Sequence, residues 1–433
     1  MIIFSYLKDK LQKYNTPLYN DSLWAIIGNV SLRGLGLLGS IFVARFLGSE
    51  VFGEYGAVKN TIVSIAIFST YGLGYTSTKY VADYYNKKGV DVKDFIKIAF
   101  NITLILSLFI AALTLIFAQY IANVVLNQPS LVDLIRYVAI WVVFNALTTL
   151  QIGFLSGFGQ YKAMAKINTI VGLVTFGFSV IFTWLYSLNG AIFALIISQI
   201  INWILYYRLL QKQLGKVDNL STENYKKVTY KEVLQFSFPI ALQEMVYSIT
   251  SWLSTIIIIK YSTYSQLGLH TASAQWSAIV LFIPVVLRNV VLSNLSKQDD
   301  HKNHKNIVKK MVIINLLCTI LPTIIIALFS GLITNLYGKS FESLKGILFV
   351  ALFSSVFISI NSVYSQAFMS IGKNWIMFFL RLLRDSTILV LTIYLLVNYK
   401  SVLGGAMALN FAILTSNVIF MILMMYIYNN FKQ

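Results

Sequence analysis

The stretch SLRGLGLLGSIFVARFLGSEVFGEYG, residues 31–56, decides the fold class of this chain. Residues 32–46 are almost all apolar or glycine, which is the pattern of a membrane-spanning helix. Arg33 nevertheless lies inside this run, and Arg45 lies near its end. A guanidinium group at bilayer depth costs about 2.5–3.5 kcal/mol even on lenient insertion scales, so Arg33 needs a specific partner or a functional role.

The composition of the whole chain agrees with this interpretation. Of its 433 residues, 57% are hydrophobic and only 12% are charged, whereas soluble proteins carry about 25% charged residues. Cys318 is the only cysteine, which excludes an intramolecular disulfide framework and a cysteine-cluster metal site. The chain is therefore predicted to be an integral membrane protein, and we expect neither a cofactor nor a bound metal.

The net charge of +18 is explained by membrane orientation rather than by nucleic-acid binding. Most lysines lie near the termini and in alternate connections between apolar runs, and such an excess marks the cytoplasmic side. This asymmetry predicts a multi-pass protein with both termini in the cytoplasm, in which residues 1–21 form a polar lead-in rather than a cleaved signal peptide. Membrane lipids, not nucleic acids, are the expected surroundings.

Apolar runs of about 20 residues predict transmembrane helices. Twelve such runs are present, at residues 22–47, 54–77, 97–121, 133–157, 165–187, 190–210, 234–260, 267–292, 307–331, 344–369, 375–397 and 402–428. The predicted outer connections are short, the longest being residues 332–343. They leave no room for an extracytoplasmic catalytic domain, so we do not expect an enzyme.

A weak internal repeat divides the chain. Moving residues 44–57 by 215 positions places Arg45 on Lys260 and Gly53 on Gly268. Parallel repeats that hold a substrate between them near the midplane are an established transporter plan. The predicted fold is therefore all-α, with two six-helix bundles related by a pseudo-two-fold axis normal to the membrane. The predicted parts are residues 1–210, a cytoplasmic linker at 211–233 and residues 234–433.

Ionisable side chains inside the predicted spans are the candidate site residues. Five are basic: Arg33, Lys59, Arg288, Arg381 and Arg384. Two are acidic, Glu244 and Asp385, so about three positive charges stay unneutralised and the lumen is expected to attract an anion. Arginine suits phosphate in particular, because its planar fork binds two oxygens and never deprotonates.

The positions of these residues refine the hypothesis. Arg33 lies about 16 Å along its helix from the cytoplasmic start, near the midplane. Arg381, Arg384 and Asp385 share one helix face, and their spacing favours a pair between Asp385 and Arg381 that leaves Arg384 for phosphate. A purely structural clamp between helices is the alternative for these three residues.

Other candidates have simpler alternatives. Arg288 and Lys59 can extend to the headgroups at the membrane surface. Arg33 can form an ion pair with Glu244 across the two bundles. Glu244 follows Pro239 in its span and can instead serve as a proton or sodium site.

Two histidine-containing segments are weak candidates. The stretch DDHKNHKN, residues 299–306, is interpreted as a solvated cytoplasmic loop rather than a metal site. His270 lies at the outer end of a predicted span and has no evident chemistry.

Several motifs together indicate a family. ARFLGSEVFGEYG at 44–56 and FSTYGLGYTSTKYVADYY at 68–85 place Arg45, an aromatic residue and Leu-Gly before Gly-x-Tyr and a Gly-Leu-Gly turn. LSGFGQYKAMAKIN at 155–168 and FPIALQEMVYSITSWLSTIIIIKY at 238–261 fit as well. This pattern resembles the polysaccharide-export branch of the multidrug/oligosaccharidyl-lipid/polysaccharide (MOP) exporter superfamily. The second repeat, with Lys260 and YSTYSQLG, departs from the Leu-Gly pattern.

The resemblance implies a Wzx-type flippase in the bacterial inner membrane. Such a protein moves undecaprenyl-diphosphate-linked oligosaccharide, the repeat unit of an O-antigen, capsule or exopolysaccharide, to the outer leaflet, and other polysaccharide-assembly membrane proteins are further expected partners. Three alternatives stay open. They are a cation-coupled multidrug extruder of the same superfamily, a peptidoglycan-precursor flippase, which usually has two more spans, and a membrane glycan polymerase or glycosyltransferase.

Overall fold

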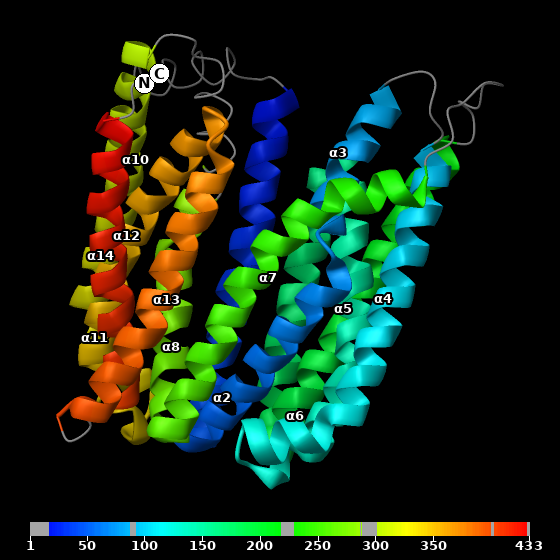
Figure 1. Cartoon of the computed structure of the whole chain (residues 1–433). Coiled ribbons are helices and arrows are strands. Elements are labelled where there is room, and N and C mark those ends of the chain that lie inside the picture. Colours follow the sequence, from blue (N-terminus) through cyan, green and yellow to red (C-terminus); the bar gives the residue numbers. More distant parts are fainter. Residues whose placement is uncertain are drawn as a thin grey trace, which may run out of the picture. The chain divides into compact units, whose positions relative to one another are not determined.

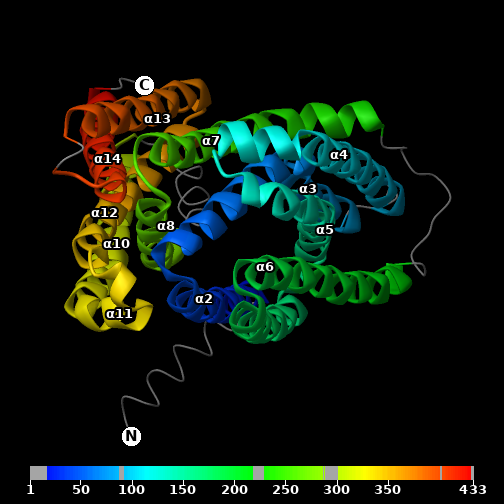
Figure 2. The same ribbon diagram turned by 90° about the horizontal axis from the view of Figure 1, so that it is seen from below.

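The computed structural model describes residues 17–86, 92–217, 229–285, 287, 301–399 and 402–430. Within these ranges every regular element is helical (Figures 1 and 2). Eight of the helices are long and apolar enough to cross a membrane. The predicted all-α membrane fold is therefore confirmed.

The helices follow the predicted spans closely. The first half of the chain contains α2 (Pro17–Thr70), α3 (Leu73–Asn86), α4 (Val92–Tyr120), α5 (Val132–Gly157) and α6 (Tyr161–Val217), with a π-helical turn at Ile121–Val125 and a 3-10 turn at Pro129–Leu131. The second half contains α7 (Tyr230–Tyr261), α8 (Tyr264–Val280), α10 (His301–Leu328), α11 (Ser330–Tyr337), a 3-10 turn at Lys339–Phe341, α12 (Leu344–Ser370), α13 (Asn374–Asn398) and α14 (Gly405–Asn430).

Two of the long helices each contain two spans. Gly48 interrupts α2 with φ 72° and ψ 170°, and Ser187 interrupts α6 with φ 52°. Gly48 lies in a predicted connection and Ser187 directly precedes one. A glycine adopts positive φ without steric strain, whereas a serine does so uncommonly. The eight long helices therefore cover ten of the predicted spans, because α2 and α6 cover two each. The helices α8 and α13 lie on the other two, so the described helices correspond to all twelve predicted spans.

The chain forms two compact units, which differ from a simple division into halves. Unit 1 contains the chain through Ser40, Ile62–Ala118 and Asp133–Met245. Unit 2 contains Ile41–Thr61, Gln119–Val132 and the chain from Val246 onward. The predicted linker at 211–233 stays a prediction, since α6 extends to Val217, α7 begins at Tyr230, and residues 218–228 lie outside the described ranges.

Each unit has its own apolar core. In unit 1, large side chains such as Phe95, Phe154 and Tyr206 pack between α4, α5 and α6. In unit 2, α12 is the central helix and packs against α8, α10, α13 and α14 (Figures 1 and 2). The core of unit 2 includes Phe368, Phe420 and Met424.

The sequence repeat has a direct structural counterpart inside unit 2. The helix break at Gly48 corresponds, 215 residues later, to the break between α7 and α8 at Thr263. Beyond these breaks the two segments cross. A Cβ atom on Gly53 would collide with the carbonyl oxygen of Tyr264, and one on Gly268 would collide with the carbonyl oxygen of Ser49. The same shift relates Ser49 to Tyr264 and Gly53 to Gly268, so the contact is reciprocal.

Candidate functional site

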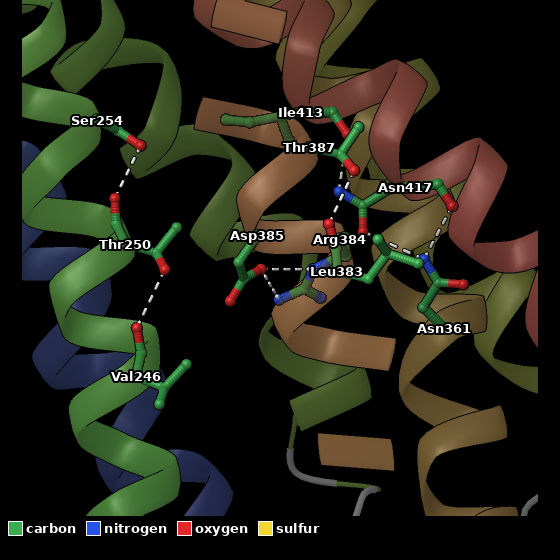
Figure 3. A network of polar contacts seen from close by, with 10 residues as sticks. All are labelled: Val246, Thr250, Ser254, Asn361, Leu383, Arg384, Asp385, Thr387, Ile413 and Asn417. Atoms are coloured by element: carbon green, nitrogen blue, oxygen red, sulfur yellow. Dashed lines mark hydrogen bonds and ion pairs between the residues drawn. The ribbon is translucent and has the colours of Figure 1, made fainter. Parts of the chain in front are cut away.

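A buried ion pair lies on α13 in unit 2 (Figure 3). Arg384 Nε donates a hydrogen bond of 2.8 Å to Oδ1 of Asp385, and Nη2 forms an ion pair with the same oxygen at 2.6 Å. The Arg384 side chain is 17% exposed and that of Asp385 is 6% exposed. A charge removed from water needs such a partner, because an isolated buried ion is strongly unfavourable.

This pairing corrects the sequence prediction. The i,i+4 spacing favoured Arg381 as the partner of Asp385, with Arg384 left for phosphate. The structure instead joins Asp385 to its neighbour Arg384. The spacing rule compares Cβ positions, whereas the long arginine side chain folds back along the helix to reach the adjacent carboxylate. Arg381 lies half-buried on the same helix.

The guanidinium group of Arg384 is held from a second direction. Its Cζ atom lies 5.5 Å from the centre of the Phe420 ring on α14, a distance typical of a cation–π contact. α13 packs against α14 along this region. One edge of the guanidinium group therefore faces Asp385 while Phe420 contacts the group as well.

Two asparagines form an amide pair between α12 and α14. Asn361 Nδ2 donates to the carbonyl oxygen of Asn417 at 3.0 Å and to its side-chain oxygen at 3.1 Å. Asn417 Nδ2 donates in turn to the carbonyl oxygen of Ile413 at 2.8 Å. Figure 3 shows this network in the same region as the Arg384–Asp385 pair. Asn417 lies one helical turn before Phe420 on α14, so the amide pair and the ion pair adjoin the same stretch of that helix.

The interior of unit 2 is polar where α12 passes through it. Six buried polar side chains come from this helix: Ser354, Ser355, Ser359, Asn361, Ser365 and Gln366. Among the buried atoms without a hydrogen-bond partner in the described residues are Asn361 Oδ1 and Gln366 Nε2 on α12 and Ser416 Oγ on α14. Buried polar atoms are nearly always hydrogen-bonded in proteins, so these atoms can accept or donate to a ligand or to water.

The remaining unit 2 candidates are Lys59 and Arg288. Lys59 is half-buried on α2, and its Nζ atom lies 5.7 Å from the centre of the Tyr55 ring one turn earlier. Arg288 lies outside the described residues. The participation of both in anion binding stays a prediction.

Arg33 and Glu244 both belong to unit 1. Arg33 is exposed on α2, and Glu244 is half-buried on the part of α7 that packs with this unit. Thr76 and Ser237 join α3 to α7 through a hydroxyl–hydroxyl hydrogen bond of 2.8 Å. The sequence assigned Glu244 to the second bundle, but the structure places it with Arg33. An ion pair between the two stays a prediction.

Aromatic side chains fasten the first turns of α7 to α3. Lys79 Nζ lies 4.2 Å from the centre of the Phe236 ring, and the Tyr80 ring lies 5.3 Å from the same ring. Burial, with smaller effects from Tyr80 and nearby acids, raises the pKa of Tyr84 to about 12. This phenol is therefore neutral at physiological pH, and the cluster packs the helices rather than moving protons.

Sequence reasoning missed one buried polar network. Residues 299–306 were interpreted as a loop, but α10 begins at His301 and His304 is buried. His304 Nδ1 lies 2.6 Å from the hydroxyl of Tyr428, and Nε2 lies 2.9 Å from Oγ of Ser370. The signal was present, since His304 precedes Ile307, Val308 and Met311 at helical spacing and extends their apolar stripe.

The comparisons with known proteins agree with the family that the sequence motifs indicate. Residues 18–292 match the family model described as polysaccharide biosynthesis protein. A putative O-antigen transporter of Shigella flexneri is 23% identical over 398 residues, covering 90% of this chain and 93% of that protein. An uncharacterized membrane protein of Methanocaldococcus jannaschii is 23% identical over 423 residues, covering 94% of this chain and 96% of that protein.

Solved structures share the fold. An inward-facing multidrug resistance MATE family transporter of the MOP superfamily superimposes with a TM-score of 0.72, at 14% identity, over 94% of this chain and 98% of that one. The lipid II flippase MurJ in an inward closed conformation also gives 0.72, at 17% identity, over 95% of this chain and 88% of that one. At these identities the likeness shows the fold alone. The family match, however, spans more than half of the 433 residues, and the protein therefore belongs to the polysaccharide biosynthesis protein family.

Proposed function

We propose that this protein is a flippase that moves polyprenyl-diphosphate-linked oligosaccharide from the cytoplasmic to the outer leaflet of a bacterial inner membrane by alternating access. The family and the S. flexneri relative, a putative O-antigen transporter, support a role in polysaccharide export. The fold shared with a lipid II flippase is compatible with a lipid-linked substrate.

The observation that carries the proposal is the position of Arg384. Its head group lies in a predicted membrane span yet is only 17% exposed, so protein rather than lipid surrounds it. An arginine kept inside a membrane protein is a candidate for anion binding, and a diphosphate is an anion that a planar fork fits well. Arg381, Arg33, Lys59 and Arg288 are the further candidate contacts for the diphosphate.

The proposal leaves two roles open for Glu244. It is half-buried in unit 1 and is a candidate either for an ion pair with Arg33 or for a proton or sodium site that couples transport to an ion gradient. Asp385, by contrast, has a role as the ion-pair partner of Arg384. Transport without covalent chemistry is the expected activity, and no enzymatic step is included.

Proteoliposomes test the proposal. Purified protein is reconstituted with polyprenyl-diphosphate-linked oligosaccharide whose sugars carry a fluorescent label, and a membrane-impermeant reagent then quenches the exposed label. We expect the quenched fraction to rise from about half to nearly all of the label only in vesicles that contain the protein. No rise above protein-free vesicles would contradict the proposal, and extrusion of cationic dyes by the same vesicles would favour the drug-extruder alternative.

A further inference from the structure

We infer that Asp385 and Phe420 position Arg384 so that the outer edge of its guanidinium group, formed by Nη1 and Nη2, binds two oxygens of a phosphate. This inference rests on the proposed function and assigns Asp385 as a positioning residue. It differs from the sequence hypothesis, in which Asp385 was to be bound by Arg381.

The first step is the choice of edge. A guanidinium group has a side edge, made of Nε and one terminal nitrogen, and an outer edge, made of the two terminal nitrogens. Asp385 lies against the side edge, because Nε donates a hydrogen bond to its Oδ1 and Nη2 forms an ion pair with the same oxygen. Within the described residues the structure gives no hydrogen bond to Nη1 or to the hydrogen of Nη2 that points away from Asp385, so the outer edge has no acceptor there.

The second step is the restriction of motion. Adjacent residues on a helix project about 100° apart, so the arginine side chain meets Asp385 only when it curls along the helix surface. Phe420 on the neighbouring helix contacts the guanidinium group at 5.5 Å. A carboxylate and a ring therefore hold the group from two directions, which reduces the conformational freedom that a ligand would otherwise have to remove.

The third step is access. The Arg384 side chain keeps 17% of its surface exposed, whereas Asp385 keeps 6%. The carboxylate is thus the inner partner, and the guanidinium group is the one that a ligand reaches. Two parallel N–H donors at a fixed spacing match the oxygens of a phosphate, which a lysine at the same place cannot imitate.

Charge and geometry predict opposite effects of removing the carboxylate. Asp385→Asn adds one net positive charge beside the ligand, so simple attraction would tighten binding of an anion. If Asp385 positions Arg384, the same variant loosens the fork and weakens binding. The sign of the effect therefore separates a positioning role from a general electrostatic one.

The experiment measures binding of undecaprenyl diphosphate to purified protein in nanodiscs. We expect Asp385→Asn and Arg384→Lys each to raise the Kd at least 5-fold, and Phe420→Leu to raise it about 3-fold. Asp385→Glu, which keeps the carboxylate, should raise the Kd less than Asp385→Asn does. Asp133→Asn, at an exposed pair with Arg136, is the matched control and should leave the Kd unchanged. Tighter or equal binding by Asp385→Asn would overturn the inference.

Three further outcomes are assigned in advance. If Asp385→Asn does not fold, Phe420→Leu decides, since it keeps the ion pair: a Kd equal to that of the unmodified protein overturns the inference. If the unmodified protein binds undecaprenyl diphosphate and flips the labelled substrate while all four variants behave like it, the positioning role fails and the proposed function stands. If the unmodified protein neither binds nor flips, the proposed function fails and this inference falls with it.

Discussion

Gly53 and Gly268 lie at a reciprocal helix crossing within unit 2. A side chain on either one would meet the backbone of the other segment, at the carbonyl oxygens of Tyr264 and Ser49 respectively. Close crossings of membrane helices depend on small residues because the backbones themselves come into contact. The two repeats therefore meet at the positions that the 215-residue shift makes equivalent.

The crossing predicts a sharp dependence on residue size. Gly53→Ala should lower stability by about 1–3 kcal/mol, because an added methyl group overpacks the contact and the backbone cannot yield freely. Gly36→Ala on the same helix is the matched control, since nothing lies within 4 Å of its added Cβ. Thermal unfolding in detergent measures both variants, and equal stability of the two would contradict the close crossing.

A cross-link at the same place tests whether the crossing opens during transport. Ser49 Oγ lies 2.8 Å from Ser265 Oγ, so Ser49→Cys with Ser265→Cys should form a disulfide in a Cys318→Ser background. We expect oxidation to slow flipping at least 10-fold and reduction to restore it. Undiminished flipping by the oxidised, cross-linked protein would show that these segments stay together throughout the cycle, and Ser49→Cys alone controls for the oxidant.

Arg33 should be required for transport through its charge and shape. Arg33→Ala is expected to lower flipping at least 10-fold, with Arg33→Lys intermediate, because lysine keeps the charge but not the planar fork. Arg136→Ala is the control, since its pair with Asp133 at 3.0 Å is exposed and such pairs contribute about 0–1 kcal/mol. Normal flipping by a well-expressed Arg33→Ala variant removes Arg33 from the site.

A double-mutant cycle separates the two roles left open for Glu244. If Glu244 pairs with Arg33, the combined variant Arg33→Gln with Glu244→Gln should be no slower than the worse single variant. We expect this non-additive result. A different result, in which Glu244→Gln alone abolishes the response of flipping to an imposed proton or sodium gradient, would assign Glu244 to ion coupling instead.

The His304 network should stabilise the ends of α10, α12 and α14. Ser370 Oγ donates its proton to the carbonyl oxygen of Ala367 at 2.8 Å, so it accepts from His304 Nε2 and leaves Nδ1 to accept from Tyr428. Tyr428→Phe should therefore cost about 1–3 kcal/mol of unfolding free energy, because a buried acceptor loses its donor. Tyr426→Phe, at an exposed tyrosine two residues earlier, should have no measurable effect in the same thermal assay.

The helices and the repeat were predictable because both depend on patterns along the chain. Apolar length located the spans, and the breaks at Gly48 and Thr263 appeared where the repeat required them. The ion pair at Asp385 was predictable only in part. A buried carboxylate on that face needed an arginine, but the choice between Arg381 and Arg384 depends on how a long side chain folds against Phe420, a residue 36 positions later.

Other features depend on contacts that sequence distance hides. His304 lies in a segment of charged and polar residues, and only its contacts with Tyr428 and Ser370 distinguish it from a surface histidine. Glu244 follows the predicted linker, so a division at the linker assigned it to the second bundle. The contacts of α3 with the first turns of α7 place it instead with Arg33.

The serines of α12 have a consequence for the rate at which unit 2 can rearrange. Ser354, Ser355 and Ser365 each donate to a carbonyl oxygen of their own helix, at 2.7–3.0 Å. Their hydroxyl groups therefore break no bond to another helix when α12 shifts by a fraction of a turn. The polar contacts with other helices that such a shift would strain are the amide pair of Asn361 with Asn417, the contact of Ser359 Oγ with Thr319 Oγ1 and the contact of Ser370 Oγ with His304 Nε2. Removing one of these contacts is the route by which mutation would speed the motion.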